Sequence, residues 1–174
     1  GLRPDAPIYA VHGPYWVGYK PLVIGEGTSK LEAGIWYPAL NPKGDKEQVT
    51  YTTSVGDFHG HALLNAVVDS SKGPYPLVVF SHGTGGTGTG YGTIIEHFAS
   101  YGFVVIAPNH NDQQEANSWA VAEIDRPRQD IQVLDYAEKI TAAGGDMAGL
   151  IDMSRVAAAG HSQGGSTALT MGGA

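Results

Sequence analysis

The sequence predicts an α/β fold with a mostly parallel, doubly wound sheet. Short, continuous apolar runs cover residues 77–80, 103–107 and 155–159, as in strands that are buried on both faces. Segments with helical spacing follow these runs, and glycine or proline separates one element from the next. Strands that alternate with helices favour parallel strands joined by crossover helices.

The leading part, residues 1–75, has a different residue pattern, which predicts strands and turns rather than alternating strands and helices. Residues 16–24 and 31–37 are rich in β-forming side chains and bounded by Gly, Pro and Ser. A polar loop is expected at 41–48, and a short helix at 62–68. We therefore divide a single domain into leading strands and loops (1–75) and a βαβ core (76–174).

Within that core, the first helix follows a Gly-rich loop at 83–90. Its apolar residues fall at positions i, i+1, i+4 and i+5, which form one face of a helix. Gly102 is the expected C-terminal stop. These positions are Ile94, Ile95, Phe98 and Ala99.

The second helix is expected to begin at Pro127, after a long polar connection over 109–124, because proline is tolerated in the first turn. Its roughly helical apolar positions are Ile131, Leu134, Ala137 and Ile140, and Gly144 and Gly145 end it. A third helix is predicted over 166–171. We expect the charged side chains at 126, 128 and 130 to form surface or inter-element ion pairs.

Composition limits the classes of function. The net charge of −7 and the pI near 5.3 argue against nucleic acid as a partner. No apolar run approaches ~18 residues, so no transmembrane segment is expected. Cysteine is absent, which excludes a Cys nucleophile, thiolate metal sites and disulfides within the chain. The first residue is Gly1 rather than Met, and on this basis we expect a secreted or periplasmic protein, with the cytoplasm as the alternative.

The strongest chemical signal is Gly160-His161-Ser162-Gln163-Gly164, which fits the G-x-S-x-G nucleophile elbow. A serine between a strand end and a helix start must turn sharply. The flanking glycines are needed because a Cβ there would clash with the neighbouring strand or helix. The predicted strand at 155–159 and helix at 166–171 supply this context, so Ser162 is the expected nucleophile.

A second motif, His82-Gly83-Thr84-Gly85-Gly86, follows the strand at 77–80. Such a loop can supply the second backbone N–H of an oxyanion hole. We expect the N–H groups of Gln163 and Thr84 to be the two donors. A plain Gly-rich turn is the alternative.

These segments resemble the α/β-hydrolases, in particular the branch of platelet-activating-factor acetylhydrolases and dienelactone hydrolases. Chlorophyllases and cutinase-type polyester hydrolases are similar. The resemblance implies an α/β-hydrolase fold and hydrolysis of small or lipid-like carboxylic esters through an acyl-enzyme, with no cofactor and no metal. The matching segments are GPY at 13–15, VGY at 17–19, IWYP at 35–38, FSHG at 80–83, SYGFVV at 100–105, RPRQD at 126–130, IDMSRV at 151–156 and GHSQGG at 160–165.

The triad of this fold runs Ser, then Asp or Glu, then His, but no such residue follows Ser162. The chain is therefore expected to be the N-terminal portion of the fold, with the strand at 155–159 left as an apolar edge. We expect the acid and the base on a second chain, with a truncated chain as the alternative. His82 and His161 are expected to be structural, because neither is placed to act as a base.

The sequence is also compatible with different classes of function. Gly83-x-Gly85-x-x-Gly88 formally matches a dinucleotide fingerprint, but the acidic residue that should end the next strand is absent. His59 and His61 lack further ligands at a recognisable spacing for a metal. A dienelactone-type hydrolase, an amide hydrolase and a catalytically inactive hydrolase-like scaffold are each compatible with the same motifs. Trp119 is expected either to line a substrate pocket or to anchor the 109–124 connection.

Overall fold

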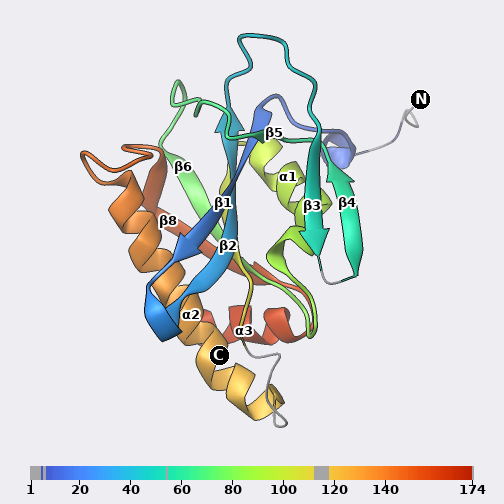
Figure 1. Cartoon of the computed structure of the whole chain (residues 1–174). Helices are drawn as coiled ribbons and strands as arrows, with labels where there is room; N and C mark the ends of the chain where they lie inside the picture. The colour runs from blue at the N-terminus through green and yellow to red at the C-terminus, as the bar shows by residue number, and fades with distance from the viewer. Residues whose placement is uncertain (1–4, 6, 54, 112–117, 174) are drawn as a thin grey trace.

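The computed structural model describes residues 5, 7–53, 55–111 and 118–173, and its centre is a six-stranded sheet with the order β5-β1-β2-β7-β6-β8 (Figure 1). Strands β7, β6 and β8 run parallel, whereas β2 pairs antiparallel with both β1 and β7. Along the chain, the parallel strands thus follow the antiparallel pair β1 and β2. The strands are β1 (Trp16–Ile24), β2 (Leu31–Ala39), β5 (Leu63–Leu64), β6 (Tyr75–Ser81), β7 (Val104–Pro108) and β8 (Ile151–Gly160).

A separate two-stranded hairpin, β3 (Val49–Thr53) and β4 (Gly56–Gly60), lies beside the central sheet (Figure 1). Tyr51 pairs directly with Phe58 across the two antiparallel strands, so both side chains lie on the same face of the hairpin. Tyr51 belongs to the hydrophobic core, and this face is therefore the one turned toward the domain.

Helices cover both faces of the sheet, which confirms the doubly wound prediction. One core cluster packs the sheet against α1 (Gly92–Ser100) and the other packs it against α2 (Ser118–Thr141). Helix α3 (Gln163–Met171) contacts α2, β6 and β8. Three short 3-10 turns are η1 (Ile8–Ala10), η2 (Gly27–Ser29) and η3 (Gly88–Tyr91).

The prediction that Pro127 opens the second helix is wrong, because α2 begins at Ser118 and holds Pro127 in its interior. The expected connection over 109–124 is helical from 118 onward, and residues 112–117 lie outside the described part. Proline removes one backbone hydrogen bond from the helix. Ala122 and Arg126 precede Pro127, and their burial anchors the first turns of α2 to the domain.

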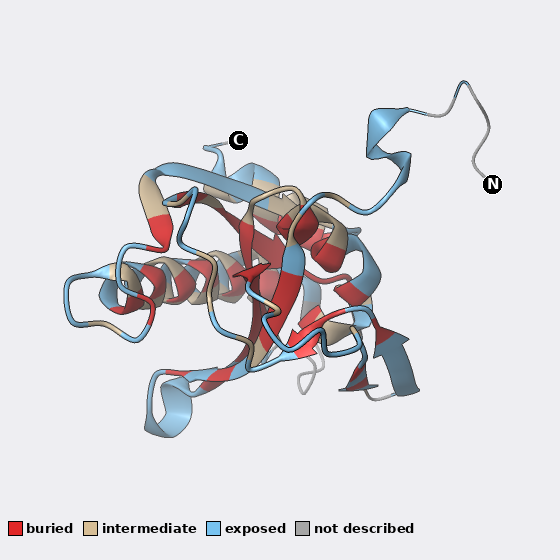
Figure 2. Cartoon of the chain, turned by 90° about the horizontal axis from the view of Figure 1, so that it is seen from above, coloured by how far each residue is buried: buried red, intermediate tan, exposed pale blue. Residues whose placement is uncertain are grey.

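The buried stripe of α2 is also shifted from the expected one. Ile131 is half exposed, whereas the buried positions follow spacings of three and four residues (Figure 2). Two of these positions are charged, so the stripe is not wholly apolar and the apolar pattern alone misplaces the face. The buried positions are Ala122, Arg126, Asp130, Val133, Ala137 and Ile140.

The short helix expected at 62–68 is not formed. Leu63 and Leu64 instead pair in parallel with Gly18 and Tyr19 of β1, and the Asn65 N–H donates to the Tyr19 carbonyl at 2.8 Å. Backbone pairing with an existing strand satisfies these groups without the cost of nucleating a short helix.

Strand β8 forms one edge of the sheet and pairs only with β6 among the described strands. Its residues 154–158 are exposed, including the apolar Val156. This confirms the predicted apolar edge. No helix in the described ranges is both long and apolar enough to cross a membrane.

Candidate active site

Ser162 lies between the end of β8 and the start of α3, in a backbone conformation that is unfavourable for a residue with a Cβ. Its φ is 54° and its ψ is −122°, and it immediately precedes the first residue of the helix. The side chain is exposed to solvent. The strand–turn–helix context predicted for this serine is thus present, and the backbone strain is stored at the residue expected to react.

The glycines on either side of this turn are required by close backbone approach. A Cβ at Gly160 would lie 2.2 Å from the Gly164 carbonyl oxygen, and a Cβ at Gly164 would lie 2.0 Å from the Ser81 carbonyl oxygen. A Cβ at Gly165, in contrast, would make only an ordinary contact at 3.7 Å. Hence the first and fifth positions of the motif need glycine, whereas the sixth does not.

The loop over residues 83–90 brings Thr84 next to the Ser162 turn. The Thr84 hydroxyl donates to the side-chain oxygen of Gln163 at 2.9 Å, which ties together the two residues expected to provide N–H donors. Within the described part of the chain, neither backbone N–H donates to a protein acceptor.

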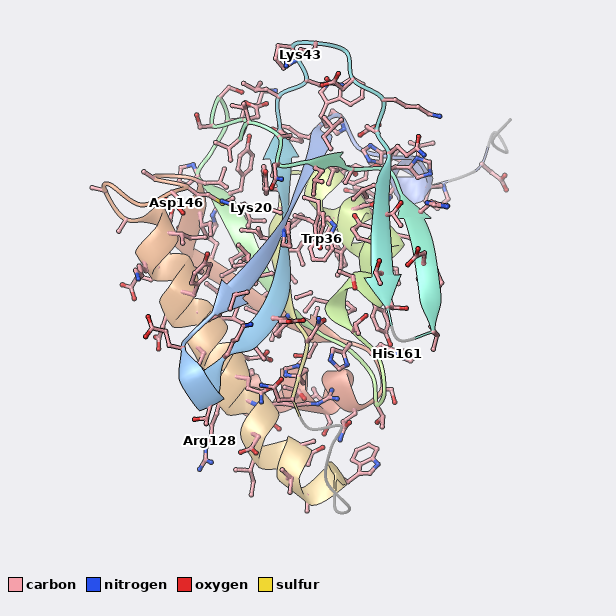
Figure 3. All side chains as sticks on the ribbon, viewed as in Figure 1. Lys20, Trp36, Lys43, Arg128, Asp146 and His161 are labelled. Carbon is pink, nitrogen blue, oxygen red and sulfur yellow. The ribbon has the colours of Figure 1, made fainter. Side chains whose placement is uncertain are left out.

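Tyr91 links this loop to the turn on the other side. Its hydroxyl accepts from the Gly83 N–H at 3.2 Å and lies 2.9 Å from His161 Nδ1. His161, labelled in Figure 3, therefore has its Nδ1 occupied by Tyr91. This contact agrees with a structural role.

His82 is fully buried below the loop, and both of its ring nitrogens are engaged. Its Nε2 accepts the His110 backbone N–H at 3.0 Å, so the proton is on Nδ1, which lies 2.7 Å from the Gly83 carbonyl oxygen. A neutral imidazole used in this way fixes the start of the loop and has no lone pair to offer Ser162.

Helix α2 contributes a buried polar cluster beneath the same loop. Arg126 donates through a guanidinium nitrogen to the His82 carbonyl oxygen. Asp130 accepts from the Ser81 hydroxyl at 2.7 Å, and its other oxygen lies 3.9 Å from His110 Nε2. Burial raises the pKa of Asp130 to about 7, against the lowering effects of the Ser81 hydrogen bond and the Arg126 charge.

The expectation of surface ion pairs is thus wrong for Arg126 and Asp130, which are 0% and 1% exposed. It holds for Arg128, which is exposed and lies 3.4 Å from Asp125. The sequence signal for the cluster is the helical register, since residues 126 and 130 continue the buried stripe through 133, 137 and 140.

A cavity of about 260 Å³ opens beside the loop, between it and the β3–β4 hairpin. The sequence carries no motif that marks the hairpin residues on this side. Trp119, on the first turn of α2, is 55% exposed and is not among the residues that line this cavity. No group of three His, Cys, Asp or Glu residues suited to a metal ion occurs in the part that the structure describes.

The mostly parallel sheet, its two helical layers and the strained serine at the strand–helix turn define the class of protein: the chain has the α/β-hydrolase fold. Residues 49–173 match the family model of chlorophyllase, which covers most of the chain. The chain belongs to the chlorophyllase family, in agreement with the resemblance noted in the sequence.

Curated relatives come from two groups. Platelet-activating factor acetylhydrolase of Cavia porcellus is 30% identical over 130 residues, which cover 62% of this chain and 30% of that protein. Chloroplastic chlorophyllase-1 of Citrus unshiu is 31% identical over 108 residues, covering 62% of this chain and 32% of that protein. The matches thus span about a third of these relatives' length.

Among solved structures, a ferulic acid esterase from Streptomyces cinnamoneus is similar with a TM-score of 0.66. Its sequence is 22% identical, and the match covers 96% of this chain and 57% of that one. At this identity the likeness shows the fold.

Proposed function

We propose that the protein hydrolyses carboxylic esters, with Ser162 as the nucleophile and the backbone N–H groups of Gln163 and Thr84 as the oxyanion hole. The observation that carries the proposal is the strained, exposed Ser162 at the N-terminus of α3. The backbone N–H groups of Gln163 and Thr84, which have no acceptor among the described residues, support the same assignment. The acetylhydrolase and esterase names of similar proteins support the same class of reaction.

In this reaction the Ser162 oxygen would attack the ester carbonyl carbon, and the carbonyl oxygen would take the negative charge between the two N–H groups. Loss of the alcohol would leave an acyl-enzyme, which water hydrolyses to the acid and free serine. Such donors act because they are in place before the charge develops, and removing one typically lowers turnover by about 10²–10³-fold.

The serine also needs a general base. No Asp, Glu or His occurs between Ser162 and Ala174, and the histidines at 82 and 161 are engaged elsewhere. We therefore propose that the base and its carboxylate partner come from polypeptide outside these 174 residues, either in the same protein or on a second chain.

The test is labelling of the native protein, with any polypeptide that accompanies these residues, by an alkyl fluorophosphonate. The reaction forms a bond between the serine oxygen and phosphorus and releases fluoride. We expect one adduct per molecule at Ser162, loss of labelling in Ser162→Ala, and normal labelling in Ser166→Ala. Ser166 is a suitable control because it lies one turn further along α3 and hydrogen-bonds to Glu123. A folded protein that takes up no label would contradict the proposal.

A further inference from the structure

The cavity beside the 83–90 loop has two kinds of wall. The loop contributes backbone and small side chains, whereas the β3–β4 hairpin contributes Thr53 and the apolar Val55 and Phe58. None of the described residues that line the cavity is charged. An ester group held by Ser162 would lie next to this space, because Thr84 both lines the cavity and bonds to Gln163. The lining residues are Thr53, Val55, Phe58, Thr84, Gly85, Gly86, Thr87, Gly90 and Tyr91.

Phe58 is the residue whose exposure needs an explanation. It pairs with Tyr51 on the face of the hairpin that turns toward the domain, and yet 47% of its surface is exposed. Because it lines the cavity, we infer that part of this inward-facing ring is exposed there. Val55, at the hairpin tip, is 80% exposed and lines the same cavity. Filling the cavity with an apolar group would remove both side chains from water.

The base of the hairpin is held rigidly, so its inner face is a fixed wall. The Trp36 indole N–H donates to the Tyr51 hydroxyl at 2.8 Å, and that hydroxyl donates to Glu96 at 2.6 Å. The Glu96 carboxylate also accepts the backbone N–H of His61 at 3.0 Å, just beyond β4. These contacts join the hairpin to β2 and α1 (Trp36 is labelled in Figure 3).

Two glycines allow the backbone to come close to the side chains of this network. A Cβ at Gly92 would lie 2.5 Å from the Tyr51 ring, and a Cβ at Gly60 would lie 2.1 Å from the Glu96 carboxylate. The start of α1 and the end of β4 therefore need glycine where they touch the network. The hairpin is thereby fixed in position relative to the helix that follows the loop.

We propose that the β3–β4 hairpin and the 83–90 loop form the binding subsite for an uncharged, apolar portion of the ester, with Phe58 as its main specificity determinant. The proposal rests on the proposed function, since it assigns the substrate class of the Ser162 site. The described lining residues offer no charge to pair with an ionised group, so the subsite favours an uncharged one. The preferred esters are those with an alkyl or aryl group that reaches the Phe58 ring.

The experiment compares two fluorophosphonates that differ only in their alkyl chain, ethyl or octyl, on the native protein. The ratio of the octyl to the ethyl labelling rate measures how strongly the subsite favours an apolar chain. In Phe58→Ala we expect the octyl-to-ethyl ratio to fall about tenfold, as is usual for loss of an apolar contact in a specificity pocket. Phe58→Leu, which keeps an apolar side chain, should lose less. Unfolding midpoints measured alongside show that the variants are folded.

His59→Ala is the matched control. His59 is the next residue of β4 and points to the opposite face, where it contacts Thr50. Its ratio should stay within about twofold of the wild type. A ratio that is unchanged in Phe58→Ala while labelling proceeds would overturn the subsite and leave the proposed function standing.

Failure of the proposed function gives a different result. If no fluorophosphonate reacts, the subsite is tested by calorimetric titration with 2-decanone, an uncharged alkyl ketone that cannot be hydrolysed. Binding that is about tenfold weaker in Phe58→Ala than in His59→Ala supports the subsite even then. Equal affinity, or no binding to the wild type, overturns it.

Discussion

Two regions flank the 83–90 loop, and they differ in polarity, burial and openness. On the α2 side, Arg126, Asp130 and His82 are almost fully buried and bonded to one another's backbone or to Ser81. On the hairpin side, Val55 and Phe58 are apolar, partly exposed and next to an open cavity. One side is polar and buried, whereas the other is apolar and open.

The two regions therefore have different roles: the buried cluster on the α2 side holds the loop in place, and the open cavity on the hairpin side can receive a ligand. A buried charged cluster is costly, and breaking it leaves uncompensated groups, so it fixes one arrangement of the backbone. An exposed apolar surface gains free energy only when something covers it. The two sides can therefore be tested by substitutions that should affect stability on one side and selectivity on the other.

The largest expected effect is on the buried cluster. Arg126→Met keeps much of the side-chain bulk but removes the donor to the His82 carbonyl and the charge beside Asp130. We expect the free energy of unfolding at pH 8 to fall by about 3–5 kcal/mol, measured by urea denaturation. Arg128→Met is the control, because this exposed arginine pairs with Asp125 at the surface and should contribute at most about 1 kcal/mol. Equal losses in the two variants would contradict the assignment.

The buried cluster should also make the stability of the protein depend on pH. The pKa of Asp130 is raised to about 7 in the folded state, so the native protein holds a proton there that the unfolded chain releases near pH 4. The free energy of unfolding should therefore fall as the pH rises from about 4 to about 7, by on the order of 4 kcal/mol.

Asp130→Asn should lack this fall, since the amide does not titrate. The groups facing Asp130 are Arg126 and Ser81, with His110 at 3.9 Å, and they are unchanged in the variant. Urea denaturation of both proteins across this range gives the difference curve. A variant that follows the wild-type pH profile would show that Asp130 does not carry the effect.

The smallest expected effect is on the anchoring of the hairpin. Burial and the nearby Glu96 carboxylate raise the pKa of Tyr51, so its hydroxyl stays protonated and donates. Tyr51→Phe removes that bond and leaves the buried Trp36 N–H without an acceptor. We expect a loss of about 1–3 kcal/mol in the free energy of unfolding, together with a two- to threefold lower octyl-to-ethyl labelling ratio.

Tyr19→Phe is the control for this change. The Tyr19 ring packs edge-on against Tyr51 with centroids 5.0 Å apart, but within the described residues its hydroxyl makes no hydrogen bond. Its removal should cost less than about 1 kcal/mol and leave the ratio unchanged. If both variants behave alike, the hydroxyl network does not position the hairpin.

Much of the fold could be predicted because its signals are local. The buried strands β6 and β7 are short apolar runs, and the Ser162 motif carries its own geometry in Gly160 and Gly164. The buried face of α2 could not be placed from apolar residues alone. Two of its positions are charged, and hydrogen bonds to Ser81 and His82, made by distant segments of the chain, help to compensate for their burial.

By itself, the sequence determined the α/β class, the strand–turn–helix around Ser162 and the loop that follows the strand at 77–80. Each of these depends on residues close together in the chain. The tertiary structure decided which residues surround the serine. Phe58 and Arg126 lie more than thirty positions from Ser162 in sequence. The residue type alone does not predict which side chains either of them contacts in the fold. Their roles follow from contacts between distant segments, namely a buried polar cluster on the α2 side and an open apolar wall on the hairpin side.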